Sequence, residues 1–196
     1  VNAELLIDHA WGWEPCTIET IKSYKPSTNS FSSGQVLQEP YTAKKARVVV
    51  REMAESVALN LLDKGMVTNQ LVLTIGYDVI NLSNSNIEAK YVGEVTTDYY
   101  GRKVPKHAHG TANLDNHTSS AKQISDAVME LFDRIVNSNL LVRRINLTTN
   151  NVIDESVAVN NDVSVQFDLF TDYEAVENEM RIEKDKLEKE RKVQSA

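Results

Sequence analysis

The chain has a single cysteine, Cys16, among its 196 residues. One thiol excludes a disulfide framework within the chain and fits a reducing, cytoplasmic compartment. No group of cysteines and histidines has the spacing of a zinc site, so no metal ligands are predicted. No apolar run approaches the length of a membrane span, and no secretory signal opens the chain, so we expect no membrane partner.

The sequence also lacks a recognisable catalytic arrangement. Its 28 acidic residues are scattered, and no Ser/His/Asp or Cys/His pattern stands out. An enzyme in its own right is therefore the least favoured functional class. The chain starts without methionine, in what reads as the middle of a helix at residues 4–7, so we expect a piece of a longer protein.

The formal net charge of −7 argues at first against binding to nucleic acid, but the charge is unevenly distributed. Residues 153–196 hold 12 acidic and 6 basic residues, which leaves the preceding body close to neutral. Local basic groups in the body could hold phosphate oxygens, although not tightly at physiological salt. Taken singly, each group reads as solvated surface. The groups are Lys44, Lys45, Arg47 and Arg51, then Arg102, Lys103 and Lys106, then Arg143 and Arg144.

Periodicity divides the body into two strand–helix–strand units. Strands are expected at residues 31–38, 68–77, 107–114 and 140–149. The first helix opens at Pro40 and Thr42 and closes at Gly65, and the second follows a capping pair, Ser120 and Gln123. Apolar residues recur at helical spacing in both. They are Ala46, Val50, Met53, Val57 and Leu61, then Ile124, Val128, Leu131, Phe132 and Ile135.

Two such units predict an α+β fold of the ferredoxin-like type. This βαββαβ unit forms a four-stranded antiparallel sheet with two helices on one face. Residues 78–106 form a long insertion between strands 2 and 3, with a hairpin expected around Tyr100 and Gly101. A short helix with a glycine stop is expected within residues 1–11, followed by a linker, and spaced charge pairs beyond Phe170 predict a helical C-terminal tail. We therefore divide the chain into residues 1–30, 31–152 and 153–196.

One face of the predicted sheet is uncovered, and alternation along each strand indicates which side chains it carries. Hydroxyls, amides and imidazoles suit phosphate oxygens, whereas the lack of aromatics disfavours stacking on single-stranded bases. An ordinary solvated face is the alternative interpretation. On the first strand, Ser33 or Gln35 is the expected outward residue. The other outward residues are Gln70, Val72, Thr74, His107, His109, Thr111, Asn113, Arg144, Asn146 and Thr148.

The segment Gln166-Phe167-Asp168-Leu169-Phe170 places two large apolar residues together at the start of the charged tail. Leaving such side chains in water costs about 1.5–3 kcal/mol each. Exposed hydrophobic residues on such a segment indicate a partner with a pocket. The alternative is that they form a last strand or cover the core of their own domain.

These segments together resemble the C-terminal part of a bacterial Y-family translesion DNA polymerase, in the UmuC-like impB/mucB/samB branch. Residues 32–37 resemble the Ser-x-Gly motif that opens the little finger domain, and residues 141–147 resemble its last strand. Residues 5–12 resemble the end of the preceding thumb. Residues 166–170 resemble the peptide with which the family holds the ring-shaped sliding clamp.

The resemblance implies contacts with the backbone of duplex primer–template DNA, without base specificity, beside the remaining polymerase domains. It also implies that Gln166, Phe167, Asp168, Leu169 and Phe170 bind the bacterial sliding clamp. The DNA contacts that it implies are Ser33, Gly34, Gln35, Lys103, Lys106, His109, Thr111, Arg143 and Arg144.

The family's two magnesium ions lie in the palm domain, whose acidic motifs this chain lacks. We therefore expect no cofactor and no polymerase activity from this piece, although the full-length protein would be a DNA polymerase. The implied setting is translesion repair, within the SOS response, in the bacterial cytoplasm near the nucleoid. The alternative is a ferredoxin-like regulatory domain that binds a small ligand, or a protein-interaction module, without DNA binding.

Overall fold

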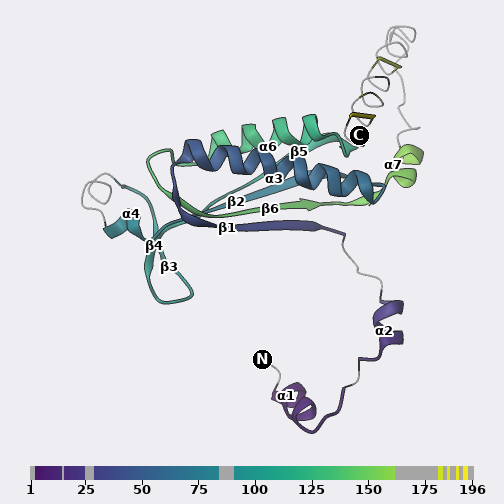
Figure 1. Cartoon of the computed structure of the whole chain (residues 1–196), viewed down its shortest axis with the longest axis horizontal. Coiled ribbons are helices and arrows are strands. Elements are labelled where there is room, and N and C mark those ends of the chain that lie inside the picture. Colours follow the sequence, from purple (N-terminus) through teal and green to yellow (C-terminus); the bar gives the residue numbers. More distant parts are fainter. Residues whose placement is uncertain are drawn as a thin grey trace, which may run out of the picture.

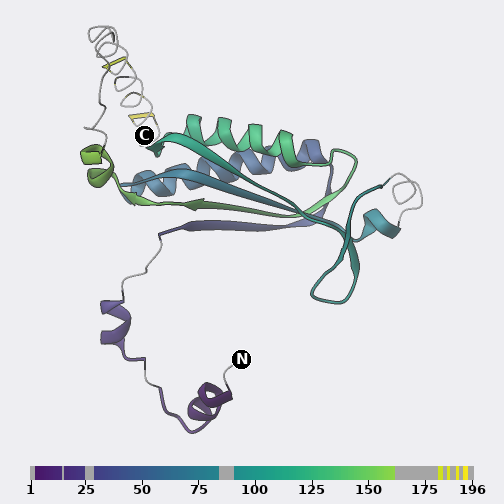
Figure 2. The same cartoon turned by 180° about the vertical axis from the view of Figure 1, so that it is seen from behind.

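The computed structural model describes residues 3–14, 16–24, 29–83 and 91–161, together with isolated positions between 181 and 193. The chain begins with α1 (Ala3–Ala10), which ends just before Gly12, where φ is +77°. α2 (Ile18–Ser23) follows, capped by the Thr17 hydroxyl, in a stretch where the sequence predicted only a linker. Both helices lie away from the sheet in both views (Figures 1 and 2).

Two long helices, α3 (Ala43–Asp63) and α6 (Ala121–Ile135), form one layer of the domain (Figure 1). The Thr42 hydroxyl accepts from the backbone N–H of Lys45, and the Ser120 hydroxyl accepts from that of Gln123, so both predicted N-caps are confirmed. The apolar stripes predicted for both helices are buried, except that Ile135 at the end of α6 is only partly buried. Arg47 on α3 also forms a two-point ion pair with Asp133 on α6, with N···O distances of 2.8 and 2.9 Å.

The main sheet consists of β1 (Phe31–Tyr41), β2 (Met66–Tyr77), β5 (Ala108–Thr118) and β6 (Val142–Asn150), in the order β1-β6-β2-β5. β7 (Ile153–Asp154) pairs with the start of β2, so the described residues form five strands in this sheet. All pairings are antiparallel. The mixed α/β fold with an antiparallel sheet is therefore as expected.

The predicted ferredoxin-like arrangement is not observed. In that arrangement the first and third long strands join the two halves of the sheet, whereas here the second and fourth, β2 and β6, form the central pair. The reason lies in the side chains. β2 and β6 carry fully buried aliphatic residues, while β1 and β5 are rich in serine, glycine, asparagine and histidine and therefore occupy the edges. The buried residues are Leu71, Leu73, Ile75, Ile145 and Leu147.

α3 and α6 cover the same face of the sheet (Figures 1 and 2). Gly110 on β5 allows α6 to approach, because a Cβ there would lie 2.9 Å from side-chain atoms of Leu131 and Ile135. At the free edge of β5, the Arg134 guanidinium of α6 donates to the carbonyl of Thr111 at 2.9 Å. No described helix covers the opposite face of the sheet, which we call the open face.

The insertion between β2 and β5 contains α4 (Ile80–Ser83) and a hairpin formed by β3 (Val95–Thr97) and β4 (Lys103–Pro105). Asn81, which is fully buried, fastens the insertion to the sheet. Its amide donates to the carbonyls of Asp78 and Leu141 and accepts from the Leu141 N–H. In both views the hairpin projects from the end of the sheet on the side away from the helices (Figures 1 and 2).

After β7 the last continuously described segment is α7 (Glu155–Asn161). The five residues from Gln166 to Phe170, and most of the predicted tail helix, lie outside the described residues. Among the helices that the structure describes, none combines the length and the apolar character that crossing a bilayer requires.

Candidate functional site

The open face carries alternate side chains of the four long strands, arranged in rows by the strand pairing. Residues that pair directly across antiparallel strands place their side chains on the same face. Polar residues dominate these rows, as predicted for β5, β2 and β6. The rows are Gly34–Asn146–Thr74–His109, then Ser32–Thr148–Val72–Thr111, then Asn150–Gln70–Asn113.

Hydrogen bonds link these side chains across the strands. The Thr74 hydroxyl lies 2.9 Å from Nδ1 of His109, and the Ser32 and Thr148 hydroxyls lie 3.0 Å apart. In the third row, the Asn150 amide donates to Gln70, whose own amide donates to Asn113, each at 3.0 Å. The face therefore presents ordered, uncharged hydrogen-bonding groups rather than a layer of mobile side chains.

Arg144 adds a positive charge to one end of this face. It pairs with Val36 on β1 and with Gly76 on β2. A Cβ at Gly76 would lie only 3.2 Å from that of Arg144, so glycine leaves room for the arginine stem. The side chain of Arg144 is exposed and makes no hydrogen bond or ion pair with another residue that the structure describes. Its guanidinium is therefore available to an anion.

The expected orientation of β1 is wrong by one residue. Ser33 pairs with Leu147 and Gln35 with Ile145, and both partners are fully buried beneath the helices. Ser33 and Gln35 therefore lie on the helix-covered side of an edge strand, and the open face receives Ser32, Gly34 and Val36 instead. Burial does not distinguish the two sides of β1, because Gly34, Gln35 and Val36 are all exposed on this edge strand.

Gly34, of the predicted Ser-x-Gly motif, does lie on the open face. A Cβ at this position would approach Oδ1 of Asn146 to 2.6 Å. His109 and Thr111 on β5 are also exposed on the open face. The structure therefore brings Gly34, His109, Thr111 and Arg144 of the predicted DNA contacts onto one surface.

Arg143 is held by the protein itself. It is the extra residue of a β-bulge, since Gly76 pairs with Arg144 and Tyr77 with Val142. Its guanidinium donates to the Gln38 carbonyl at 2.8 Å, and its Nε lies 3.7 Å from the carboxylate of Asp78. Arg143 thus ties β1 and the start of the insertion to β6.

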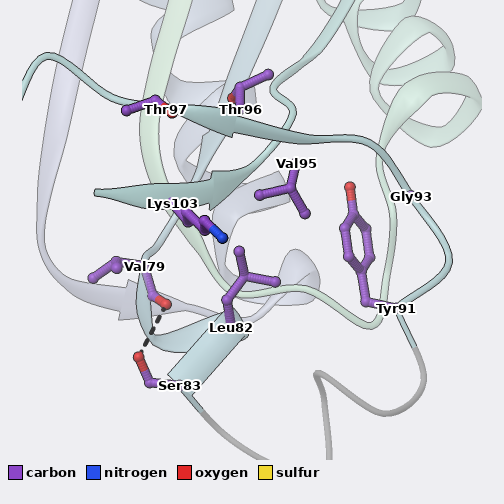
Figure 3. Close-up of a pocket in the computed structure, with 9 residues that line it drawn as sticks. All are labelled: Val79, Leu82, Ser83, Tyr91, Gly93, Val95, Thr96, Thr97 and Lys103. Carbon is purple, nitrogen blue, oxygen red and sulfur yellow. Dashed lines mark hydrogen bonds between the residues drawn. The ribbon is translucent and has the colours of Figure 1, made fainter. Parts of the chain in front are cut away.

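The two predicted lysine contacts lie on or beside the hairpin and not on the sheet. Nζ of Lys106 lies 2.7 Å from the Glu94 carboxylate, and this hydrogen bond raises the pKa of the lysine. Lys103 lines a cleft of about 640 Å³ together with Val79, Leu82 and Tyr91 (Figure 3).

A second cleft, of about 390 Å³, lies where the hairpin meets the open face. The sheet contributes Gly76, Arg143 and Arg144 to its lining, and the hairpin contributes Tyr99, Tyr100 and Arg102, among others. The sequence interpretation missed the two tyrosines as site residues. The available signal was a pair of adjacent aromatic residues before Gly101, in the expected turn of a hairpin.

His107 and His109, which could have suggested a metal site, have ring centroids 6.5 Å apart. In the part of the chain that the structure describes, no three residues of the His, Cys, Asp and Glu types are grouped to hold a metal ion.

Comparison with known proteins identifies the family. The model of the impB/mucB/samB family C-terminal domain matches residues 28–166. A solved structure, a complex of the beta-clamp processivity factor and the little finger domain of PolIV, includes a similar chain. The TM-score is 0.41 at 6% sequence identity, covering 73% of this chain and 100% of that one. No curated protein matches. The family match spans all four long strands and both covering helices.

Proposed function

The chain belongs to the impB/mucB/samB family and carries its C-terminal domain, the little finger of Y-family DNA polymerases, and we propose that its open face holds the backbone of duplex DNA. The observation that carries this proposal is the set of ordered polar rows with Arg144 at one end. Hydroxyl, amide and guanidinium groups donate to phosphate oxygens and position a protein without reading the base sequence.

The chemistry of the face fits a polymerase that must move along any template. Few charged groups lie on it, so few counterions are released on binding, and the affinity for DNA at physiological salt is low. Weak, sequence-independent contacts let the domain shift along the duplex as synthesis proceeds. The longer protein would supply the palm carboxylates and their magnesium ions, and would carry out translesion synthesis.

Weak DNA binding calls for a second attachment, and the segment from Gln166 to Phe170 supplies it in this proposal. Leu169 and Phe170 would fill a pocket on the bacterial sliding clamp, with Gln166 at its rim. A micromolar contact of this kind corresponds to about 8 kcal/mol. Tethering to the clamp raises the effective concentration of the enzyme at the primer end.

The DNA contact is tested with Arg144→Ala, measured by fluorescence anisotropy on several duplex sequences over a range of salt concentrations. Losing one phosphate contact weakens binding about equally on every sequence and lowers the salt slope by about one. Arg51→Ala is the matched control, because Arg51 is an exposed arginine on α3, in the layer on the other side of the sheet. Equal losses in the two variants, or a strong dependence on sequence, would contradict the proposal.

The tether is tested with the double substitution Leu169→Ala and Phe170→Ala. Clamp binding by the purified chain should disappear, while its affinity for duplex DNA stays unchanged. The control removes two nearby apolar side chains outside the pentapeptide, Val163 and Val165, by the same change to alanine. Unaltered clamp affinity in the Leu169/Phe170 variant would refute the assignment.

A further inference from the structure

The turn of the β3–β4 hairpin exposes two aromatic rings. Tyr99 is 96% exposed and Tyr100 is 76% exposed. Their ring centroids lie 5.5 Å apart with the planes at 87°, so the rings meet edge to face and leave ring faces open to solvent. Neither ring belongs to the hydrophobic core, so packing of the fold does not explain them.

The turn that carries these rings is held rigid by its own hydrogen bonds. One carboxylate oxygen of Asp98 accepts from the backbone N–H groups of Tyr100 and Arg102, each at 2.9 Å. Gly101 adopts φ +78°, which suits glycine. A preordered turn presents its side chains to a ligand at a low entropic cost.

Arg102 adds a cation to this turn. Its guanidinium carbon lies 5.2 Å from the centre of the Tyr100 ring, and its Nη2 lies 2.7 Å from the second carboxylate oxygen of Asp98. A hydrogen bond from Nε of Arg102 to the same oxygen, at 2.8 Å, lowers the pKa of Asp98, and together these contacts fix the arginine beside the ring. Aromatic rings next to arginine are the usual means by which proteins hold unpaired bases.

The turn is also continuous with the open face. Tyr99, Tyr100 and Arg102 share one cleft with Gly76 and Arg144, which belong to the sheet. The hairpin projects on the open side of the sheet, where the proposed duplex would lie (Figures 1 and 2). A strand that left the duplex at this end would therefore pass the tyrosines, with Arg144 close to its last paired phosphates.

We propose that Tyr99 and Tyr100 stack on unpaired bases of the DNA strand where it leaves the duplex held on the open face. This inference rests on the proposed duplex binding and adds a second substrate class, single-stranded DNA. The two surfaces divide the work. The sheet has no tyrosine, phenylalanine or tryptophan among its three polar rows and contacts the backbone, whereas the hairpin turn has two tyrosine rings and contacts bases.

The test uses the full chain and two fluorescent DNAs, a blunt duplex and the same duplex with a single-stranded oligothymidine extension. Stacking on one base increases the affinity of the wild-type chain for the extended duplex about tenfold over the blunt duplex. Tyr99→Ala with Tyr100→Ala removes that gain and leaves blunt-duplex binding unchanged. Tyr99→Phe with Tyr100→Phe keeps the gain, because the ring faces remain.

The control is Tyr24→Ala, which removes an exposed tyrosine outside the hairpin. Circular dichroism confirms that each variant is folded. An extension that gives no gain to the wild-type chain, or a gain that survives in the double alanine variant, would overturn the inference. Failure of the duplex proposal is distinguishable, since the blunt duplex alone would then not bind. A partner protein as the true occupant would show no gain with any DNA extension.

Discussion

At the scale of single residues, two glycines of the sheet meet different kinds of neighbour. Gly110 faces the helices, where a Cβ would press on Leu131 and Ile135 at 2.9 Å. Gly34 faces the solvent, where a Cβ would meet only the end of the exposed Asn146 side chain. Close-packed neighbours cannot give way, whereas an exposed side chain can rotate aside.

Alanine substitutions at these glycines should therefore differ in effect. Gly110→Ala forces α6 away from β5 and should lower the free energy of unfolding by about 1–3 kcal/mol. Gly34→Ala should change it by less than about 0.5 kcal/mol. Urea denaturation of the two variants gives both values. A loss of stability in Gly110→Ala as small as that in Gly34→Ala would mean that α6 can move away from β5 at little cost.

Asn81 is the residue that anchors the insertion, and Asn81→Ala removes three hydrogen bonds at once. Because the site is fully buried, the variant should lose about 1–3 kcal/mol of stability. Thermal or urea unfolding provides the measurement. Asn139→Ala, at an exposed position near Leu141, serves as the matched control and should leave stability unchanged.

At the scale of elements, α3 and α6 are joined by the ion pair between Arg47 and Asp133. The hydrogen bond from the guanidinium lowers the pKa of Asp133 below the ordinary aspartate range. A carboxyl whose pKa is lowered by folding contributes stability above its unfolded pKa and loses it as the pH falls through the folded value. The contribution is therefore complete at neutral pH and decreases below about pH 4.

Asp133→Asn should reduce stability at pH 7, and the difference from the wild type should shrink as the pH falls below about 4. Both side chains are partly exposed, so the effect is small and decreases with salt. Urea denaturation at several pH values measures it. A difference that is constant from pH 7 to pH 3 would show that the ion pair does not stabilise the contact between the helices.

The elements themselves were largely predictable from the sequence. α3 and α6 have apolar residues at helical spacing and side-chain caps at Thr42 and Ser120, and both are local features. The order of the strands was not predictable in the same way, because it depends on which pairs of strands bury the most apolar surface together. The orientation of β1 could not be predicted for a related reason. β1 is an edge strand, and residues 32–36 show little alternation between buried and exposed positions.

At the scale of the whole molecule, the acidic tail opposes the proposed contact with DNA. Residues 162–196 hold ten acidic and six basic residues, so removing them takes the formal net charge from −7 to −3. Like charge near a DNA-binding surface lowers affinity, most of all at low salt. A chain ending at residue 161 should therefore bind duplex DNA more tightly than the full chain at low salt.

Anisotropy titrations of the two chains at about 0.02 M and 0.2 M salt test this. The difference in affinity should be largest at low salt and should shrink as screening increases. The shortened chain also lacks Leu169 and Phe170, so it should lose clamp binding. Equal DNA affinity of the two chains at low salt would show that the tail charges lie too far from the open face to matter.

The polar character of the open face was predictable from the sequence, whereas the identity of its residues was predictable only in part. Strict alternation located His109, Thr111 and Asn146, because the opposite sides of their strands are apolar. Arg143 sits in a bulge, which a period of two residues cannot anticipate, and it is held by Gln38 and Asp78. The position of the hairpin tyrosines depends on how the insertion folds back, which only the three-dimensional structure reveals.

The contact of Arg134 with the Thr111 carbonyl has a consequence for the self-association of this protein. A bare strand edge is a template on which another extended chain can grow, and ordered fibrous aggregates begin in this way. Arg134 of α6 places a charged side chain on one backbone acceptor of β5, and this makes the edge a poor template for another strand. The contact thereby disfavours edge-to-edge pairing between two copies of this chain.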